Sequence, residues 1–563
     1  MPTITLSKKA LQDACTKKRN DEDLKERISL LGTDLERLEK DEIDVEIFPN
    51  RPDLLSQQGF NRAFASFVGD KPGLRTYKAK KATKDHEVVV EKAVEKVRPY
   101  TACAVVKGLH LKDREIKDVI RIQEKLHVTY GRNRKRCAIG IYPLEDITLP
   151  ITYTAKKPDE IRFTPLEAKK EMTGNQILSQ HPTGREYGHL LEGLDAYPVF
   201  LDATGKVLSM PPIINSEETG RITTRTRDVF IECSGHAWHV VHGALSIIAT
   251  ALADMGGAIE EMTLDYPKTL GGARQSPQLQ AREMPFNISY INKYLGMGLT
   301  KKDVKALLER MGLGYKDSTK GSVALIPPYR VDMLHPIDLV EDVAIAYGTD
   351  KVEGEVPNVA TVAEEQPLER FQDKLQQVIV GHGLVEVKNY NLSSKETQGR
   401  KVNRPENVVQ VAQAASQEYD TLRTNLLSSG LLTLQRNKHH EYPQHLFERG
   451  DVFFHDDKTE TKVREEKHLS VVMCSEDADY TKARQVLDSL GLALDVKLTV
   501  EPVQDELFIE GRAGVIKAGK KPIGVIGEVN PDVLENFLLE MPVAAFEVDV
   551  EKLYDALPKG MKI

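Results

Sequence analysis

The sequence predicts a multidomain α+β protein, and three observations lead to this prediction. The chain has 563 residues, which is too long for one hydrophobic core and corresponds to about three to five domains. Its hydrophobic content of 40% and charged content of 29% are those of an ordinary globular protein. Amphipathic helical segments and short β-branched strands both recur along the chain, without low-complexity tracts or a fixed repeat.

Charge and cysteine content narrow the class of protein. A net charge of −8 argues against a general binder of polyanions, so any RNA contact would use a local basic patch. The turn at residues 132–136 is one candidate patch, although a solvated turn explains it equally. The five cysteines show no CxxC pairing or metal-ligand spacing and are interpreted as reduced thiols. Neither a signal peptide nor a membrane-spanning segment is recognisable, so we expect a cytoplasmic protein without membrane contact.

The first predicted domain, residues 1–80, is a small α/β unit. Apolar residues at helical spacing precede a short strand expected at 45–48. The string PNRPDLLS follows at 49–56, and its two prolines exclude a helix there. Asp53 or Ser56 could cap the helix that comes next, so the plain interpretation is a rigid strand-to-helix turn.

The second predicted domain, residues 86–270, is the largest α/β block, and the charged stretch 78–85 precedes it as a linker. Helices are predicted at 117–126 and 239–255. Strands are predicted from their length and β-branched content at 88–90, 102–106, 138–142, 199–201, 207–210 and 229–232.

The third predicted domain, residues 271–350, is a small helical domain that ends in an acidic helix. An amphipathic helix is expected at 301–311. The stretch PPYRVDMLHPIDLVEDVAIAYG at 327–348 places Pro336 at a first helical position and Gly348 just past a helix end.

Four carboxylates gather in this stretch. Asp338, Glu341 and Asp342 fall at i, i+3 and i+4 of the predicted helix and so share one face. Asp332 arrives from the segment just before it. Since like charges repel, this patch indicates a cation or a basic partner, and all-oxygen ligation suits Mg²⁺ better than zinc. The alternative is a solvated acidic helix face.

The fourth predicted domain, residues 367–563, opens with an amphipathic helix at 368–380. A helix at 420–438, which contains TLRTNLL, and a strand at 446–454, which contains FERGDVFF, come next. This order resembles the antiparallel core of class II aminoacyl-tRNA synthetases.

Distinctive strings then extend the resemblance to the whole chain. PNRPDLLS, YTAKKP at 153–158, LSMPPIIN at 208–215 and the acidic stretch stand in the same order as in the β-subunit family of phenylalanyl-tRNA synthetase, archaeal/eukaryotic type. The chain has no room for the inserted oligonucleotide-binding domain or the C-terminal anticodon-binding extension of the bacterial form. The resemblance implies that the four acids bind Mg²⁺ shared with the α subunit and that PNRPDLLS is mainly structural.

The resemblance also implies where amino-acid activation takes place. Class II enzymes hold ATP phosphates with an arginine on the motif 2 hairpin and another in motif 3. After Phe454 the chain reads HDDKTE, which is too acidic to cradle phosphates, and GVIGEV at 524–529 has no arginine. We therefore expect ATP and phenylalanine to bind a partner α chain, in an assembly of two α and two β chains, and residues 367–563 to be a non-catalytic core.

A second chemistry implied by the resemblance is proofreading in residues 86–270. A pocket for phenylalanine rejects tyrosine only about 10²-fold, whereas a separate site that hydrogen-bonds the hydroxyl discriminates by about 10⁴. Glu232 could accept the tyrosyl hydroxyl or order the attacking water. The alternative is that Ser234 caps a helix and Glu232 is a strand-end charge. The residues that match the family's archaeal-type site are Phe200, which would wall the ring, Ser209 and Ser234, which could position water or ribose, and Glu232.

These expectations combine into one functional prediction with two rivals. The predicted protein supports ATP-dependent attachment of phenylalanine to tRNA(Phe) by the α subunit and hydrolyses mischarged Tyr-tRNA(Phe). Phe200 is bulkier than the aliphatic residue expected there, so a scaffold without editing, serving only assembly and tRNA docking, stays open. A free-standing deacylase is less favoured because it would have no use for a synthetase-like core.

Overall fold

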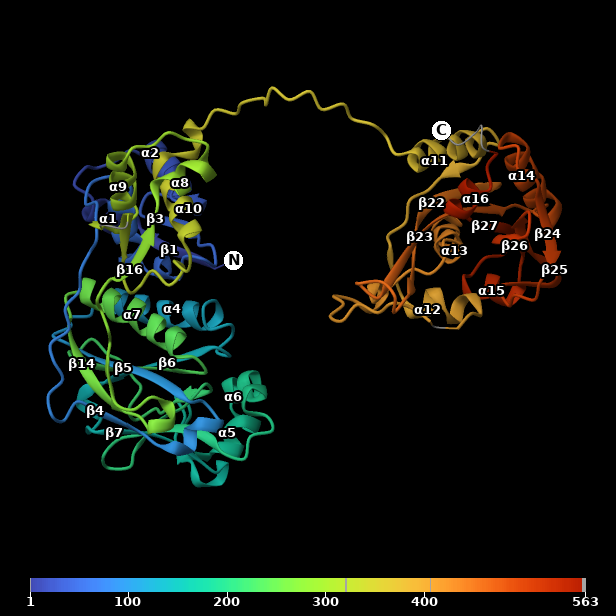
Figure 1. The fold of residues 1–563 in the computed structure, drawn as a ribbon. Coiled ribbons are helices and arrows are strands. Elements are labelled where there is room, and N and C mark those ends of the chain that lie inside the picture. Colours follow the sequence, from blue (N-terminus) through green and yellow to red (C-terminus); the bar gives the residue numbers. More distant parts are fainter. Residues whose placement is uncertain (1, 319–320, 406, 559–563) are drawn as a thin grey trace. The chain divides into compact units, whose positions relative to one another are not determined.

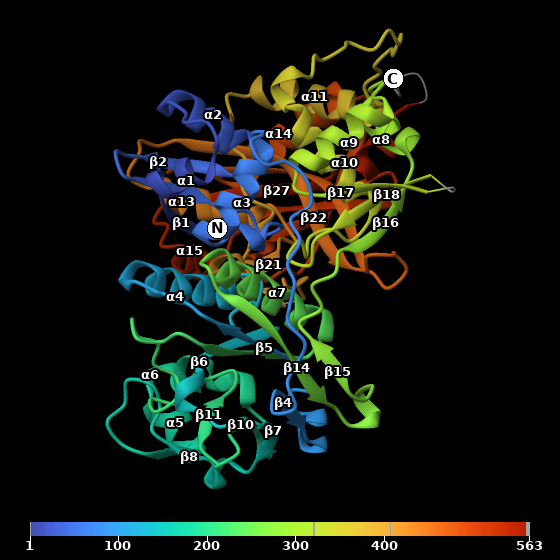
Figure 2. The ribbon, with the colours of Figure 1, turned by 90° about the vertical axis from the view of Figure 1, so that its left-hand side faces the viewer.

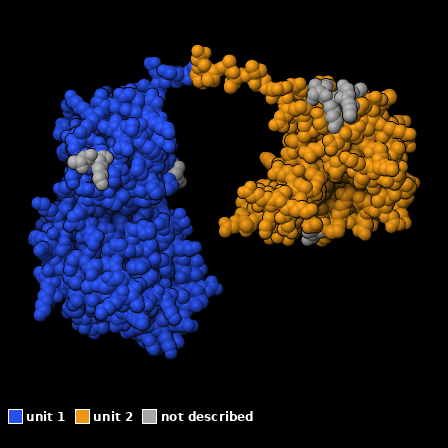
Figure 3. All heavy atoms as spheres, in the orientation of Figure 1, with its two compact units in different colours: residues 1–356 blue, residues 357–563 orange. Residues whose placement is uncertain are grey.

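The computed structural model describes residues 2–318, 321–405 and 407–558. The chain divides into two compact units, unit 1 at residues 1–356 and unit 2 at 357–563 (Figures 1 and 3). The first three predicted domains all lie in unit 1, where one continuous cluster of buried apolar side chains joins them. No helix among the described residues is long and apolar enough to cross a membrane.

The N-terminal part of unit 1 is a small α/β fold. Its three antiparallel strands have the order β1-β3-β2. Ser56 caps α3, as one of the two predicted caps, because its hydroxyl accepts the backbone N–H of Gly59 at 3.0 Å. A side chain at Gly59 would clash with the carbonyl oxygen of Asp53, so the tight turn requires glycine there. The elements are β1 (Thr3–Ser7), α1 (Lys8–Ala14), α2 (Asp21–Leu30), β2 (Asp34–Leu38), β3 (Glu42–Glu46) and α3 (Gln57–Phe67).

A ten-stranded sheet forms the largest part of unit 1. Its order is β12-β11-β10-β7-β4-β14-β5-β13-β6, and β15 pairs with β14. All six predicted strands are present, and four strands are additional: β7, β12, β14 and β15. The strands are β4 (Glu87–Val90), β5 (Tyr100–Lys107), β6 (Cys137–Pro143), β7 (Ile151–Lys156), β10 (Tyr197–Leu201), β11 (Val207–Met210), β12 (Ile214–Asn215), β13 (Val229–Gly235), β14 (Ala258–Asp265) and β15 (Arg274–Ser276).

This sheet curls so that its two end strands meet. The hydroxyl of Tyr142 on β6 lies 3.3 Å from Asn215 Oδ1 on β12, although seven strands separate β6 from β12 in the sheet order. The inner face holds buried aromatic rings, and the outer face carries the predicted helices α4 (Asp113–Val128) and α7 (Trp238–Asp254). These helices lie between the sheet and the N-terminal fold (Figures 1 and 2). Two shorter helices, α5 (Gly174–Gln180) and α6 (Pro182–Tyr187), follow a two-stranded sheet of β8 (Arg162–Phe163) and β9 (Met172–Thr173).

The third segment corrects a prediction, because it is not purely helical. The expected helices α9 and α10 are present, with α10 beginning at Pro336 and Gly348 just after its end. A three-stranded antiparallel sheet of order β16-β18-β17 accompanies them. The elements are β16 (Arg282–Phe286), α8 (Ile288–Leu295), α9 (Lys301–Arg310), β17 (Gly314–Ser318), β18 (Gly321–Ile326) and α10 (Pro336–Tyr347).

Unit 2 contains the predicted antiparallel sheet. Seven strands have the order β19-β22-β23-β27-β26-β25-β24, and only β19 pairs in parallel. The helix predicted at 420–438 starts later, at Leu427, because Thr421–Leu422 pairs with Leu392–Ser393 as a short ladder. The main elements are α11 (Pro367–Val380), β19 (Val385–Glu386), α13 (Leu427–Asn437), β22 (Gln444–His455), β23 (Val463–Cys474), α14 (Tyr480–Ala493), β24 (Leu498–Pro502), β25 (Phe508–Ala518), β26 (Lys521–Val529), β27 (Val543–Asp549) and α16 (Val550–Asp555).

Candidate functional site

Glu232 lies inside the curled sheet of unit 1. It lies in β13, between Cys103 of β5 and Gly140 of β6, and is only 1% exposed to solvent. A Cβ atom at Gly140 would come within 2.6 Å of Glu232 Oε1 and still closer to the hydroxyl of Tyr142. The glycine inside β6 therefore makes the space that the carboxyl group of Glu232 occupies.

The two oxygens of this carboxyl group have different surroundings. Oε1 is 3.2 Å from the hydroxyl of Tyr142 and 3.5 Å from that of Ser209, and both hydroxyls can donate to it. Among the described residues Oε2 is buried and has no hydrogen-bond partner. Burial raises the pKa of Glu232 to about 8, although the bonds from Tyr142 and Ser209 and the charge of Arg98 act against it. At neutral pH the group is therefore mostly a neutral carboxylic acid.

A cavity of about 200 Å³ opens beside Glu232 and Ser209. Its walls come from α4, from the basic turn after α4, and from the segment that contains Pro212 and Asn215. His127 of α4 is fixed in one wall because its Nε2 accepts the backbone N–H of Ile139 at 2.9 Å. The cavity thus gathers side chains that are far apart in the sequence.

The basic turn is part of this cavity wall. Arg134 donates to the carbonyl of Ile213 at 2.7 Å and lies 4.4 Å from the ring centroid of Tyr187. Residues 132–134 all have positive φ angles, of 49°, 52° and 63°, a conformation that side chains other than glycine rarely adopt. The guanidinium of Arg134 is engaged by these contacts, so it is not a free cation for RNA.

Phe200 and Ser234 are near the cavity but do not line it. Phe200 of β10 is fully buried and stacks on Tyr153, with ring centroids 4.2 Å apart. Ser234 continues β13, and the residue that caps α7 is Ala237, so the helix-cap interpretation of Ser234 is wrong. The guanidinium of Arg98 donates to both the hydroxyl and the carbonyl of Ser234, at 3.2 and 2.7 Å.

The structure therefore brings together two of the four predicted editing residues, Ser209 and Glu232, in the cavity lining. The other two, Phe200 and Ser234, are not part of the lining. Sequence reasoning missed several residues of the site. A glycine within a predicted strand often indicates that another group approaches the backbone closely, so Gly140 could have been recognised from the sequence. Arg134 was noted only as part of the basic turn, and the other missed residues had no local signal: Arg98, His127, Tyr142 and Asn215.

The four predicted metal ligands do not converge. Asp332 and Asp342 both bind the buried guanidinium of Arg330, at 2.8 and 2.9 Å. Asp338 accepts the backbone N–H groups of the two residues before Pro336, at 2.6 and 2.7 Å, and Glu341 is exposed.

No three of the four acids place ligand atoms within 4.8 Å of one another in the part of the chain that the structure describes. As they stand, these residues do not fit one Mg²⁺ ion. The physical reason is Arg330, two residues before Asp332, whose guanidinium already binds two of the four carboxylates.

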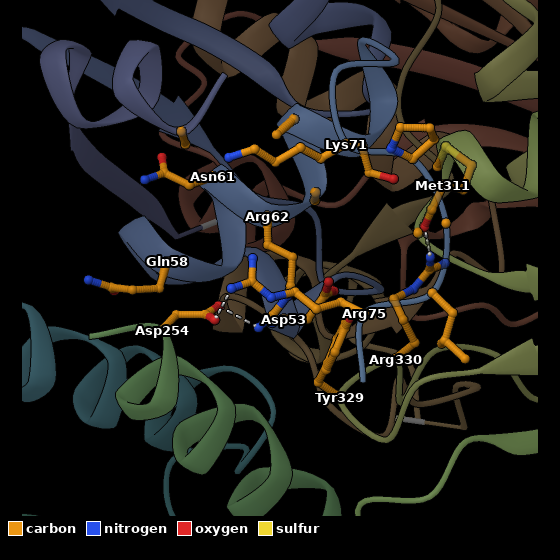
Figure 4. Close-up of a pocket in the computed structure, with 18 of the residues that line it drawn as sticks. Asp53, Gln58, Asn61, Arg62, Lys71, Arg75, Asp254, Met311, Tyr329 and Arg330 are labelled. Carbon is orange, nitrogen blue, oxygen red and sulfur yellow. Dashed lines mark hydrogen bonds and ion pairs between the residues drawn. The ribbon is translucent and has the colours of Figure 1, made fainter. Parts of the chain in front are cut away.

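A second cavity, of about 420 Å³, is lined in part by Arg51 and Asp53 of the PNRPDLLS string (Figure 4). Arg51 and Asp53 form a buried pair through two bonds of 2.8 and 2.9 Å. In the same cavity Arg62 of α3 binds Asp254 at the end of α7, at 2.9 Å, and stacks 3.8 Å from the ring centroid of Tyr329. The contacts of Arg62 join the N-terminal fold to α7 and to the segment before α10, whereas the Arg51–Asp53 pair lies within the string itself.

Comparison with known proteins identifies relatives along the whole chain. Residues 352–550 match the family described as the phenylalanyl-tRNA synthetase beta chain CLM domain, and residues 284–349 match the tRNA synthetase B5 domain. The phenylalanine–tRNA ligase beta subunit of Pyrococcus horikoshii is 40% identical over 506 residues, or 90% of each chain. That of Archaeoglobus fulgidus is 37% identical over 559 residues, or 99% of each chain.

A solved structure resembles unit 1. It is an N-terminal fragment of the phenylalanyl-tRNA synthetase beta subunit from Pyrococcus horikoshii, with 36% identity and a TM-score of 0.58. The match covers 62% of this chain and 99% of the fragment. Together with the near full-length sequence matches, this shows that the chain belongs to the family of phenylalanine–tRNA ligase β subunits.

Proposed function

We propose that this chain hydrolyses Tyr-tRNA(Phe) in the cavity at Glu232, as the β subunit of a phenylalanine–tRNA ligase whose α subunit attaches phenylalanine to tRNA(Phe). The observation that carries the proposal is the unpartnered Glu232 Oε2 beside a cavity of about 200 Å³. A dry cavity of about 150 Å³ holds one benzene molecule, so this space suits a single aromatic side chain.

The depth of Glu232 favours one of its two predicted roles. The tRNA itself cannot enter so small a cavity, so the ester bond has to stay near the opening. Glu232, almost fully buried, then meets the far end of the amino acid, where tyrosine carries its hydroxyl. Oε2 and the phenol can share a hydrogen bond there, whereas a phenyl ring would leave Oε2 unpaired, at a cost of about 1–3 kcal/mol.

The remaining residues set up this recognition. Tyr142 and Ser209 bind Oε1 and thereby leave Oε2 available for the hydroxyl of the tyrosyl group. Arg98 fixes Ser234 and places a positive charge near the carboxyl group. In the reaction a water oxygen bonds to the ester carbon, the bond to the ribose oxygen breaks, and that oxygen takes a proton, which releases tyrosine and tRNA(Phe).

Two rates in one mutant complex test the proposal. In the α–β complex, Glu232→Ala should slow hydrolysis of Tyr-tRNA(Phe) by roughly 5- to 150-fold, since a buried hydroxyl left without its hydrogen-bond partner costs about 1–3 kcal/mol. Phe-tRNA(Phe) synthesis should stay unchanged. The exposed Glu171→Ala, in the same part of unit 1, is the matched control and should alter neither rate.

Other results would contradict the proposal. A wild-type complex that leaves Tyr-tRNA(Phe) intact would support the scaffold alternative. Unchanged hydrolysis in Glu232→Ala would reduce Glu232 to a buried structural acid.

We further propose that activation of phenylalanine with ATP takes place on the α subunit, in the cytoplasm. The hairpin between β22 and β23 supports this, because its Arg464 is already engaged by the carboxylates of Asp456 and Glu466. The chain without α should catalyse no phenylalanine-dependent pyrophosphate exchange, and addition of α should restore it.

A further inference from the structure

Unit 2 contains a group of side chains that the proposed function does not use. Glu466 and His468 stand on β23, and Asp549 faces His468 directly across the ladder on β27. One ligand atom from each of the three lies within 4.8 Å of the other two. All three side chains are largely buried, with exposures of 13%, 14% and 7%.

A fourth residue fixes the imidazole ring. Glu547 Oε1 lies 2.6 Å from His468 Nδ1, and its Oε2 accepts the backbone N–H groups of Leu426 and Leu427 at 3.0 and 3.1 Å. Because Glu547 is held in this way, its Oε1 is a fixed acceptor for an N–H at Nδ1 of His468. The carboxylate–histidine arrangement is the usual outer support of a metal-binding imidazole, and a ring with its proton on Nδ1 has Nε2 available as a metal ligand.

Nε2 of this ring faces a second carboxylate. His468 Nε2 is 3.3 Å from Glu466 Oε2, and with the ring proton on Nδ1 the two atoms repel each other unless a cation lies between them. The cation is either a second proton on the ring or a metal ion. Ligand atoms about 2.1 Å from a tetrahedral metal are about 3.4 Å apart, which matches the observed separation.

We propose that Glu466, His468 Nε2 and Asp549 bind one divalent metal ion of the zinc type, with Glu547 as the positioning residue for the ring. One imidazole and two carboxylates suit Zn²⁺ or Co²⁺, whereas Mg²⁺ and Ca²⁺ take oxygen ligands alone. The ion would replace Arg464 at Glu466, which leaves Arg464 paired with Asp456, and would replace the ammonium of Lys552 at Asp549. It would connect β23 to β27 beside the start of α13. Its role is structural, and it does not depend on the editing proposal.

Titration of the full-length chain with Co²⁺ after chelator treatment tests the site. Wild type should bind one more Co²⁺ ion per chain than His468→Gln, with a visible absorption band of a low-coordinate site that Zn²⁺ abolishes. Glu547→Gln should retain the site but weaken it by about 10- to 100-fold, as expected for loss of an outer partner. His439→Gln, at an exposed histidine of the same unit, is the control and should behave as wild type.

Two outcomes would overturn the proposal. Equal Co²⁺ binding by wild type and His468→Gln would mean adventitious binding elsewhere. Protonation of both ring nitrogens of His468 at pH 7 in the presence of Zn²⁺, seen by ¹⁵N NMR, would show that a proton fills the place of the metal. Should His468→Gln fail to fold, Glu466→Gln carries the same comparison, because it keeps the size of the side chain and removes one ligand.

Discussion

Burial decides the protonation state of Glu232 and links the chemistry of the cavity to stability. The folded chain holds its pKa at about 8, whereas an ordinary glutamic acid titrates near 4.5. Between these two values the folded state binds more protons than the unfolded state, so stability must fall as the pH rises from about 4.5 to 8. A carboxyl group that recognises a phenol thus costs the fold some stability at the pH where it works.

Replacement of Glu232 by Gln should remove this dependence. The amide stays neutral at every pH, so the free energy of unfolding of the variant should rise relative to that of wild type as the pH rises toward 8. Each unit of pKa shift corresponds to about 1.4 kcal/mol, so the gain should reach a few kcal/mol, or several degrees in melting temperature. Thermal unfolding of both proteins from pH 5 to 8.5 measures it, and parallel curves would contradict the raised pKa.

Gly140 allows a second test at a single position. Gly140→Ala places a methyl group against Glu232 Oε1 and Tyr142, so it should displace both and destabilise unit 1 by about 1–3 kcal/mol. Hydrolysis of Tyr-tRNA(Phe) should fall with it, because Oε1 loses its support. Gly298→Ala is the control, since no atom lies within 4 Å of the added carbon and the residue is exposed. Equal effects of the two changes on hydrolysis would contradict the tight packing at Glu232.

Helices and strands differ in how far the sequence could predict them. Amphipathic stripes with proline or glycine at their ends predicted the bounds of α9 and α10 to within about one residue. Strand β17 was missed because its residues GYKDS are mostly polar and exposed, so no buried face marks it. Ser234 was misplaced for the opposite reason, since β13 continues through polar residues that are buried by the curled sheet.

Pairing between elements was beyond sequence reasoning at the acidic helix. The spacing of the four acids was recognised, but spacing cannot show that Arg330 folds back onto Asp332 and Asp342. Asp342 illustrates the consequence. Burial raises its pKa to about 6 in spite of the neighbouring guanidinium, so it is a structural partner in a largely dry place.

Substitutions at two adjacent residues of α10 should therefore differ strongly in their effect on stability. Asp342→Ala leaves the buried Arg330 with only one of its two carboxylate partners and should destabilise unit 1 by about 3–5 kcal/mol. Glu341→Ala removes an exposed charge and should change stability by less than about 0.5 kcal/mol. Denaturant unfolding of the two variants measures this difference.

Metal analysis of the same variants tests the Mg²⁺ prediction separately. Mg²⁺ bound by the α–β complex should be unaffected by Glu341→Ala if the four acids form no ligand set. Loss of one Mg²⁺ per β chain in that variant would instead show that assembly rearranges the acids into a site.

The whole molecule consists of two units with separate cores, and the segment between them makes this testable. Residues 353–366 are exposed throughout and form no helix or strand. Unit 2 has its own apolar clusters, built on α11, α13, α14 and the seven-stranded sheet. Each unit should therefore remain folded after the chain is cut between them.

A glutamate-specific protease should cut the isolated chain first in this segment, which contains Glu353, Glu355, Glu364 and Glu365. The products should be two fragments with the masses of unit 1 and unit 2, and each should keep the cooperative thermal transition that it shows in the uncut chain. A variant with glutamine at all four positions is the matched control and should resist this first cut. Loss of one transition on cleavage would mean that the fold of that unit depends on its connection to the other, because cutting an exposed segment breaks no contact within either core.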